Sequence, residues 1–309
     1  MVDLRMFRVD GSGRDVELRG GTVALEAELQ RRVEASMEAM LGVRFLASEY
    51  ATGWHGGRVD SLGLDENGAP VVVEYKRGVD AGVMSQAVSY LGWLESARHE
   101  FEALVCKRLG AQVGASVDWR APRVIVVAAD FTRSDRDAIR RLGIPVDMVR
   151  YRVFDGGLLV LQLVESVAGA RGSGRDRRPR WRVPEAVVDP TACGASVATE
   201  ALVVPAGLAD LYGEVAQVLG ERDVEVRATR TYIAFRRIRN VATVVFRKKS
   251  GTILLYLRLC PDEVELVEGL SRDVRDVGHN GTGDLEVRIR SAADLERARP
   301  LIARAFDAA

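Results

Sequence analysis

Three charged residues close together in the sequence have the types and spacing for metal-assisted hydrolysis. Asp60 lies in "RVDSLGLD", and Glu74 and Lys76 lie two residues apart in "APVVVEYKRG". Two carboxylates and a main-chain carbonyl, for which Tyr75 is well placed, suit a hard cation such as Mg²⁺. Such an ion can polarise a phosphodiester and activate water, while a nearby lysine orients that water or stabilises the developing charge. Asp60, Glu74 and Lys76 are therefore candidate catalytic residues, and Asp60, Glu74 and Tyr75 are candidate metal ligands.

These side chains meet only if the two segments pair as strands. "ENG" between them is an Asn-Gly turn of the kind that closes hairpins. Side chains alternate along a strand, so Glu74 and Lys76 share one face and Tyr75 points to the other. The alternative is that Asp60 and Lys76 form an ordinary ion pair on a solvated face. Against it, "VVVEYK" carries its carboxylate at the end of a core strand, where an unpaired charge is costly.

The surrounding pattern predicts a mixed α/β domain over residues 1–165. Residues 24–41 have apolar side chains at three- and four-residue intervals and are followed by Gly42, which predicts a helix. We then expect three strands, a helix within 85–110, a buried strand at 122–130, a helix at 133–143 and a final strand pair at 146–154 and 158–164.

Beyond Glu165 the pattern changes. Residues 166–200 are rich in Arg, Gly and Pro and are predicted to be a linker. Residues 201–309 regain periodicity, with a helix at 207–220, several strands, and a terminal helix capped by Ser291. We expect a second, smaller α+β domain there.

Composition limits the function classes. The chain has 309 residues, nearly half of them apolar, and no net formal charge, so it can form a real core but is not a uniformly basic nucleic-acid coat. Its three cysteines are far apart, which favours a reducing compartment. No apolar run has signal-peptide or membrane-spanning length, so we expect a cytoplasmic protein without membrane partners. His55, His99 and His279 are too scattered for a zinc site.

The segment "GRVDSLGLDENGAPVVVEYKRG" followed by "SQAVSYLGWL" resembles the PD-(D/E)xK nuclease superfamily, with its restriction-endonuclease-like mixed sheet flanked by helices. The likeness covers roughly residues 22–165 and is nearest to the NucS branch. It implies a metal-dependent DNA endonuclease using Mg²⁺ or Mn²⁺. Val59 stands where the superfamily name has Pro, a departure common among its members.

The resemblance also implies two further site residues. A first-helix glutamate often supports the metal in this superfamily, and Glu28 is our candidate, with Glu34 as a second choice. Gln86, at the start of the next helix, matches the family glutamine. From spacing alone, Glu28 could instead pair with Arg32, and Gln86 could be an exposed helix residue.

Basic and aromatic residues suggest contacts with DNA. "ATGWHGGR" would form a loop beside the site, and Arg227 to Lys249 contain eight Lys or Arg and no Asp or Glu. A connecting loop and a solvated sheet face are the respective alternatives. The candidates for nucleic-acid binding are Trp54, His55, Arg58, Arg77, Arg230, Arg236, Arg237, Lys248 and Lys249. "DVGHNGTGDLEVRIR" offers His279 and main-chain N–H groups to a phosphate, although a tight turn explains it equally well.

"YIAFRR" and "GHNGTGDLEVRIRS" resemble an uncharacterised C-terminal domain of bacterial relatives, a likeness that supplies no chemistry. Two function classes remain. The first is a metal-dependent DNA endonuclease whose C-terminal domain and Arg-rich linker hold the substrate, with a homodimer also considered. The second is a catalytically inactive nucleic-acid-binding or regulatory protein that retains the nuclease fold.

Overall fold

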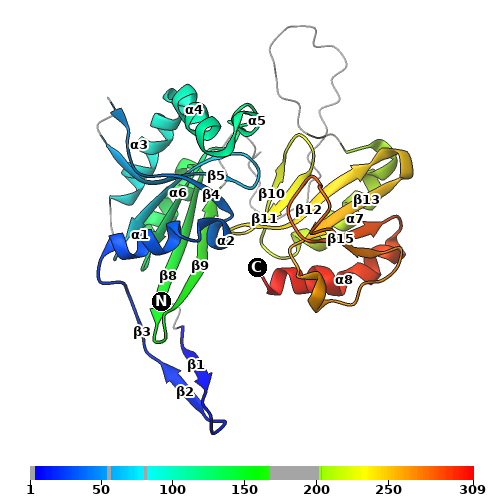
Figure 1. Ribbon diagram of the computed structural model, residues 1–309, viewed down its shortest axis with the longest axis horizontal. Coiled ribbons are helices and arrows are strands. Elements are labelled where there is room, and N and C mark those ends of the chain that lie inside the picture. The colour runs from blue at the N-terminus through cyan, green and yellow to red at the C-terminus, as the bar shows by residue number, and fades with distance from the viewer. Residues whose placement is uncertain (1–3, 54–56, 80–81, 168–201, 203) are drawn as a thin grey trace. The chain divides into compact units, whose positions relative to one another are not determined.

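The computed structural model describes residues 4–53, 57–79, 82–167, 202 and 204–309 (Figure 1). The chain divides into two compact units, Met1–Ser173 and Gly174–Ala309. The segment predicted as a linker lies outside the described residues, apart from its first two residues, which end the last strand of the first unit.

The described part of the first unit contains a seven-stranded sheet in the order β3-β8-β7-β6-β5-β4, with β9 also paired to β8. Strand β6 is parallel to β7 and β7 is parallel to β8, whereas the other pairs are antiparallel. The mixed sheet flanked by helices is therefore confirmed. Its strands are β3 (Gly20–Gly21), β4 (Val43–Ala51), β5 (Arg58–Asp65), β6 (Pro70–Lys76), β7 (Arg123–Ala128), β8 (Val146–Phe154) and β9 (Leu158–Val167).

Helices cover both faces of this sheet. On one side, α1 (Glu26–Glu34) buries Leu29 and Val33, and α2 (Met37–Leu41) buries its two end residues. On the other, α3 (Val83–Ser96) and α4 (Arg98–Leu109) pack their aromatic residues against Val72 of β6. Because side chains alternate along β6, Glu74 lies on the same face as Val72, the face of α3 and α4.

Two helices predicted as continuous are each divided. The first breaks at Ser36, whose φ of −142° is not helical, and the second at Ala97, with φ −103° and ψ 27°. Apolar spacing continues across both breaks, so periodicity alone does not reveal them. Three further elements complete the described unit: a hairpin of β1 (Met6–Val9) and β2 (Asp15–Leu18), which was not predicted, and helices α5 (Ala111–Gly114) and α6 (Arg133–Leu142).

The turn between β5 and β6 is held by a buried carboxylate. Asp65 Oδ1 accepts hydrogen bonds from the amides of Asn67, at 2.9 Å, and Ala69, at 2.7 Å. Its other oxygen pairs with Arg123, which also donates to Asp147 at 3.0 Å. Gly68 adopts a φ of 80°, which suits glycine. The predicted Asn-Gly turn is present and is fixed to the strands behind it.

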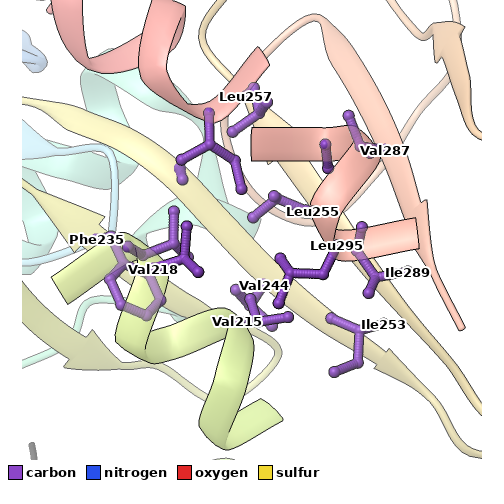
Figure 2. Packing of buried hydrophobic residues seen from close by; sticks show 14 of the residues in the cluster. Val215, Val218, Phe235, Val244, Ile253, Leu255, Leu257, Val287, Ile289 and Leu295 are labelled. Atoms are coloured by element: carbon purple, nitrogen blue, oxygen red, sulfur yellow. The ribbon is translucent and has the colours of Figure 1, made fainter. Parts of the chain in front are cut away.

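The second unit is an antiparallel sheet covered by two helices on one face. Its described strands follow the order β10-β11-β12-β13-β15-β14, and α7 (Ala209–Gly220) and α8 (Ala292–Asp307) pack on the side of Leu255 and Val287 (Figure 2). The strands are β10 (Glu225–Ala228), β11 (Ile233–Arg236), β12 (Asn240–Arg247), β13 (Thr252–Leu257), β14 (Ser271–Asp273) and β15 (Leu285–Ile289).

Short 3-10 turns join some of these elements, at η2 (Ala206–Leu208), η3 (Lys248–Ser250) and η4 (Pro261–Glu263). The Ser291 hydroxyl accepts from the amide of Asp294 at 3.3 Å, so the predicted cap of the terminal helix is confirmed. Among the described residues of the chain, the helices are all too short or too polar to cross a lipid bilayer.

Substitution of Gly63 tests the packing of β5 against β4. An alanine Cβ would lie 2.8 Å from the carbonyl oxygen of Arg44 and closer still to Val43 Cγ1. We expect Gly63→Ala to lower the free energy of unfolding of the first unit by about 1–3 kcal/mol, the usual cost of overpacking. Trp93 lies in this core, so denaturant unfolding followed by tryptophan fluorescence measures the change.

Gly92→Ala is the matched control. Gly92 lies within α3, and its added Cβ would have no heavy atom within 4 Å. Alanine should therefore stabilise the helix by up to about 1 kcal/mol. Equal effects of the two substitutions would contradict the packing described for β5.

Candidate active site

The hairpin of β5 and β6 brings Asp60, Glu74 and Lys76 together. The register pairs Ser61 with Val73, and its continuation by one residue sets Asp60 opposite Glu74. Asp60 Oδ2 accepts from the amide of Tyr75 at 3.0 Å, and Lys76 Nζ donates to Glu74 Oε1 at 2.8 Å. The three side chains therefore meet at the end of β6, on the face of α3.

Burial raises the free-energy cost of ionising both carboxyl groups of this cluster. Glu74 is only 3% exposed, and its Oε2 is buried with no hydrogen-bond partner among the described residues. Burial and then the charge of Asp60 raise the pKa of Glu74. Burial also raises the pKa of Asp60, an effect that the Tyr75 amide and Lys76 oppose and that the charges of Glu49 and Glu26 reinforce. Two carboxyl groups that resist ionisation together form a site that favours a cation.

Lys76 stays charged in this setting. Burial lowers its pKa, but the hydrogen bond and charge of Glu74 outweigh burial and leave the pKa above its usual value. The raised pKa favours the ammonium form of Lys76 beside the two carboxyl groups.

Helix α3 supplies two neutral polar groups. The Tyr90 hydroxyl donates to the carbonyl of Arg58 at 3.0 Å and lies near the Glu74 carboxylate. Burial, followed by the charge of Glu74 and hydrogen bonding with it, raises the pKa of Tyr90. Gln86 lies one helical turn earlier on the same face, and its Oε1 is buried without a partner among the described residues. Tyr90 was not predicted, although its spacing of four from Gln86 is a signal for it.

The structure places a first-helix glutamate other than the predicted Glu28 nearest the cluster. Glu26 and Glu28 are both exposed, but the first-helix carboxylate whose charge acts on Asp60 and Lys76 is Glu26. Glu26 also accepts from the amide of Arg77 at 2.9 Å, next to the end of β6. Residues two apart on a helix point about 200° away from each other, so both cannot face the site.

Glu34, the second choice, lies beneath the opposite face of the hairpin. Its Oε1 accepts from Ser61 Oγ at 2.5 Å and from Gln30 Nε2 at 3.1 Å. Gln30 also donates to the carbonyl of Asp60 at 2.9 Å. These groups support the strand that carries Asp60, and they do not join its carboxylate.

The donor set fits a hard cation. The available atoms are carboxylate oxygens of Asp60 and Glu74, the Tyr75 carbonyl oxygen and Gln86 Oε1, and two of these, Glu74 Oε2 and Gln86 Oε1, are buried without partners among the described residues. No three His, Cys, Asp or Glu within the described ranges form a metal-binding group. Mg²⁺ uses few protein ligands and keeps several waters, so two carboxylates suffice for it, whereas zinc needs a fuller set.

The residues predicted to contact DNA near the site differ in whether the structure describes them and in their partners. Trp54 and His55 lie outside the described residues. Arg58 is exposed and pairs with Glu49 at 2.5 Å, and Glu49 has an unusual positive φ of 52°. The exposed Arg77 donates to the carbonyl of Ala24 at 3.3 Å. Both arginines lie beside the carboxylate cluster and leave donors directed to solvent.

In the second unit the prediction fails for two arginines. Arg236 is only 3% exposed and pairs with Glu225 of the neighbouring strand. Arg237 is half-buried, donates to the carbonyls of Phe306 and Arg222 at 3.3 Å, and lies over the Phe306 ring. A run of basic residues does not show which of them a neighbouring strand will pair. Arg230, Lys248 and Lys249 are exposed.

Comparison with known proteins gives separate results for the two units. Residues 202–309 match a family described as "Domain of unknown function (DUF5655)", in agreement with the expected C-terminal domain. An uncharacterized protein of Haemophilus influenzae (strain KW20/Rd) is 25% identical over 302 residues, which are 95% of this chain and 97% of that protein.

Two solved structures resemble part of the chain. A repair endonuclease from Pyrococcus abyssi has a TM-score of 0.29 and 21% identity, over 42% of this chain and 49% of that one. A complex of EndoMS with double-stranded DNA has a TM-score of 0.26 and 23% identity, over 42% and 47%. The chain spans about half the length of each of these proteins.

The pKa of Asp60 leads to a stability prediction. A carboxyl group whose pKa is higher in the folded chain favours folding while protonated, and this contribution is lost as pH rises through the folded pKa. Asp60→Asn should therefore be more stable than the wild type at pH 7, with the difference vanishing below about pH 4, where the unfolded carboxyl is also protonated. Urea unfolding in the presence of chelator, followed by tryptophan fluorescence, measures the difference.

Asp10→Asn is the control, because a hydrogen bond from the Ser12 hydroxyl lowers the pKa of Asp10. That substitution should show no gain at neutral pH. A loss of stability in Asp60→Asn at pH 7 would mean that the Asp60 charge stabilises the folded unit, contrary to the burial described.

Proposed function

We propose that the chain is a metal-dependent endonuclease of the PD-(D/E)xK type that hydrolyses phosphodiester bonds of DNA. The proposal is carried by the meeting of Asp60, Glu74 and Lys76 at the end of two paired strands, with Glu74 Oε2 buried and without a partner among the described residues. A purely structural ion pair would leave no reason for a second carboxylate and an unused oxygen at the same point.

In this proposal Asp60 and Glu74 hold Mg²⁺ or Mn²⁺, with the Tyr75 carbonyl and Gln86 as further oxygen donors. The ion, when bound, would polarise the phosphodiester and lower the pKa of a water molecule. Its charge would also compensate for the two carboxylates, which otherwise repel both each other and a phosphate. Glu26 and Glu49 add to that negative potential from the edge of the site.

Lys76 acts electrostatically. The hydrogen bond and charge of Glu74 raise the pKa of Lys76, which favours an ammonium that donates hydrogen bonds. The hydrogen bond to Glu74 Oε1 fixes the ammonium at the strand end, where it can orient the attacking water and offset charge that develops on the phosphate. Tyr90 positions the rim through its hydrogen bond to the Arg58 carbonyl.

Substitution of the two charged residues of β6 tests the proposal. Glu74→Ala and Lys76→Ala should each lower the rate of DNA cleavage by about 10²-fold or more, because each removes an electrostatic contribution to the transition state. Affinity for DNA should change little, since it comes mainly from Arg and Lys contacts to phosphates. The assay uses a panel of labelled duplex, mismatched, flap and single-stranded DNAs with Mg²⁺, Mn²⁺ or chelator.

Lys107→Ala is the control, because Lys107 is an exposed lysine of α4. It should cleave like the wild type. Equal cleavage by wild type and both site variants would assign the activity to another site or to a contaminant. If the wild type binds DNA but cleaves none of the DNAs in the panel, the catalytically inactive alternative is favoured.

A further inference from the structure

A row of polar side chains crosses four strands of the second unit. Strand pairing aligns Thr243 of β12 with Tyr256 of β13, Tyr256 with Glu286 of β15, and Glu286 with Arg272 of β14. Neighbouring residues such as Leu255 and Val287 pack against α7 and α8. Because strand side chains alternate, the row lies on the other side of the sheet, which we call the outer face.

Glu286 organises the outer face. Its carboxylate is fully buried and accepts two hydrogen bonds from Arg272, at 2.7 and 2.8 Å, one from Arg288 at 2.9 Å and one from the Tyr256 hydroxyl at 3.1 Å. Burial raises the pKa of Glu286, but the hydrogen bonds from Arg272 and Arg288 outweigh it and lower the pKa overall. The ionised carboxylate therefore holds two guanidinium groups in fixed positions.

The charge balance of this cluster is positive. The Arg272 side chain is 47% exposed and that of Arg288 is 34% exposed, so both reach solvent while bound to Glu286. Arg247 is also exposed. It lies on the outer face because it is four residues along β12 from Thr243, and its charge and hydrogen bonding lower the pKa of the Tyr256 hydroxyl. Two guanidinium groups thus bind one carboxylate, and a third lies on the same face beside Tyr256. Fixed guanidinium forks with spare donors are suited to phosphate oxygens.

The loop beside this cluster has hydrogen-bonding groups that the fold does not use. The His279 ring stacks on Tyr256 with centroids 4.4 Å apart, and its Nδ1 lies 2.9 Å from the carbonyl of Val277. Within the described structure, His279 Nε2 and Thr282 Oγ1 are buried without partners. The Thr282 hydroxyl can donate a hydrogen bond, and phosphate oxygens accept.

Glycine keeps this loop against the sheet. Gly281 has a φ of 106°, and a Cβ there would collide with the Thr243 side chain. The amide of Thr282 donates to Thr243 Oγ1 at 3.2 Å. The loop is therefore held beside the arginine cluster, and its unused groups stay close to it.

We propose that the outer face around Arg247, Arg272 and Arg288 is a phosphate-binding surface that holds the DNA backbone. The choice of DNA as the source of the phosphate rests on the proposed function, whereas the phosphate chemistry rests on the cluster itself. The sequence prediction placed the contacts of this unit on Arg230, Arg236, Arg237, Lys248 and Lys249. Of these, Arg236 and Arg237 are paired or packed within the unit, and none is among the three arginines of the proposed surface.

The test measures DNA binding by the full-length chain over a series of salt concentrations, with chelator present to prevent cleavage. Removing one arginine that binds a phosphate should reduce the slope of log affinity against log salt by about one. We expect a reduction of about one for Arg247→Gln and about two for the double variant Arg272→Gln, Arg288→Gln. Arg299→Gln is the matched control, because Arg299 is on α8 and pairs with Glu296 at 2.8 Å. It should retain the parent slope.

Folding is checked by the thermal unfolding of each variant. The double variant removes partners of the buried Glu286 and can fail to fold, whereas Arg247 bears on the Tyr256 hydroxyl and its substitution leaves both arginine partners of Glu286 in place. If the double variant does not fold, Arg247→Gln decides the question alone. Parent affinity and slope in a folded Arg247→Gln, and in the double variant if it folds, would overturn the proposal.

Competition with inorganic tripolyphosphate distinguishes the source of the phosphate. Binding of tripolyphosphate that depends on these arginines, together with DNA binding that does not, would overturn the assignment to DNA. Cleavage by the wild type with no effect of the arginines would remove this inference and leave the proposed function. DNA binding that depends on the arginines, with no cleavage by the wild type, would remove the proposed nuclease function and leave the phosphate-binding surface.

Discussion

The pairing of β5 with β6 decides whether Asp60 meets Glu74 and Lys76. A shift of one residue in that register would send Asp60 to the face of α1 and leave Glu74 without its neighbour. The register is set at the turn, where the buried Asp65 carboxylate binds two turn amides and the guanidinium of Arg123. Chemistry at one end of the hairpin therefore depends on an ion pair at the other.

The two units use buried carboxylates in opposite ways. In the first, Glu74 is buried with only part of its hydrogen-bonding capacity used, and its pKa rises. In the second, Glu286 is buried with two arginines and a tyrosine, and its pKa falls. An incompletely paired buried charge needs a further partner, whereas a fully paired one is a scaffold for the groups around it. The first arrangement suits a cation site and the second a surface for anions.

The sequence predicted β5, β6 and the turn between them well because their signals are local. Alternation, the Asn-Gly turn and the apolar run before Glu74 all lie within about twenty residues. Predictions that needed tertiary geometry did less well. The choice between Glu26 and Glu28 depends on where α1 begins and how it is rotated, and the fate of Arg236 depends on the carboxylate that β10 places opposite it. Neither is encoded in spacing along the chain.

The hydrogen bonds from the turn amides to Asp65 restrict local opening of the turn between β5 and β6. Surface turns usually open independently of the sheet they join, and their amide hydrogens exchange quickly with solvent. Here the amides of Asn67 and Ala69 donate to a buried carboxylate that is itself bound to Arg123. Releasing them requires breaking a buried ion pair, so these two amides belong to the same cooperative unit as the central strands and should exchange at the slow rate of the sheet.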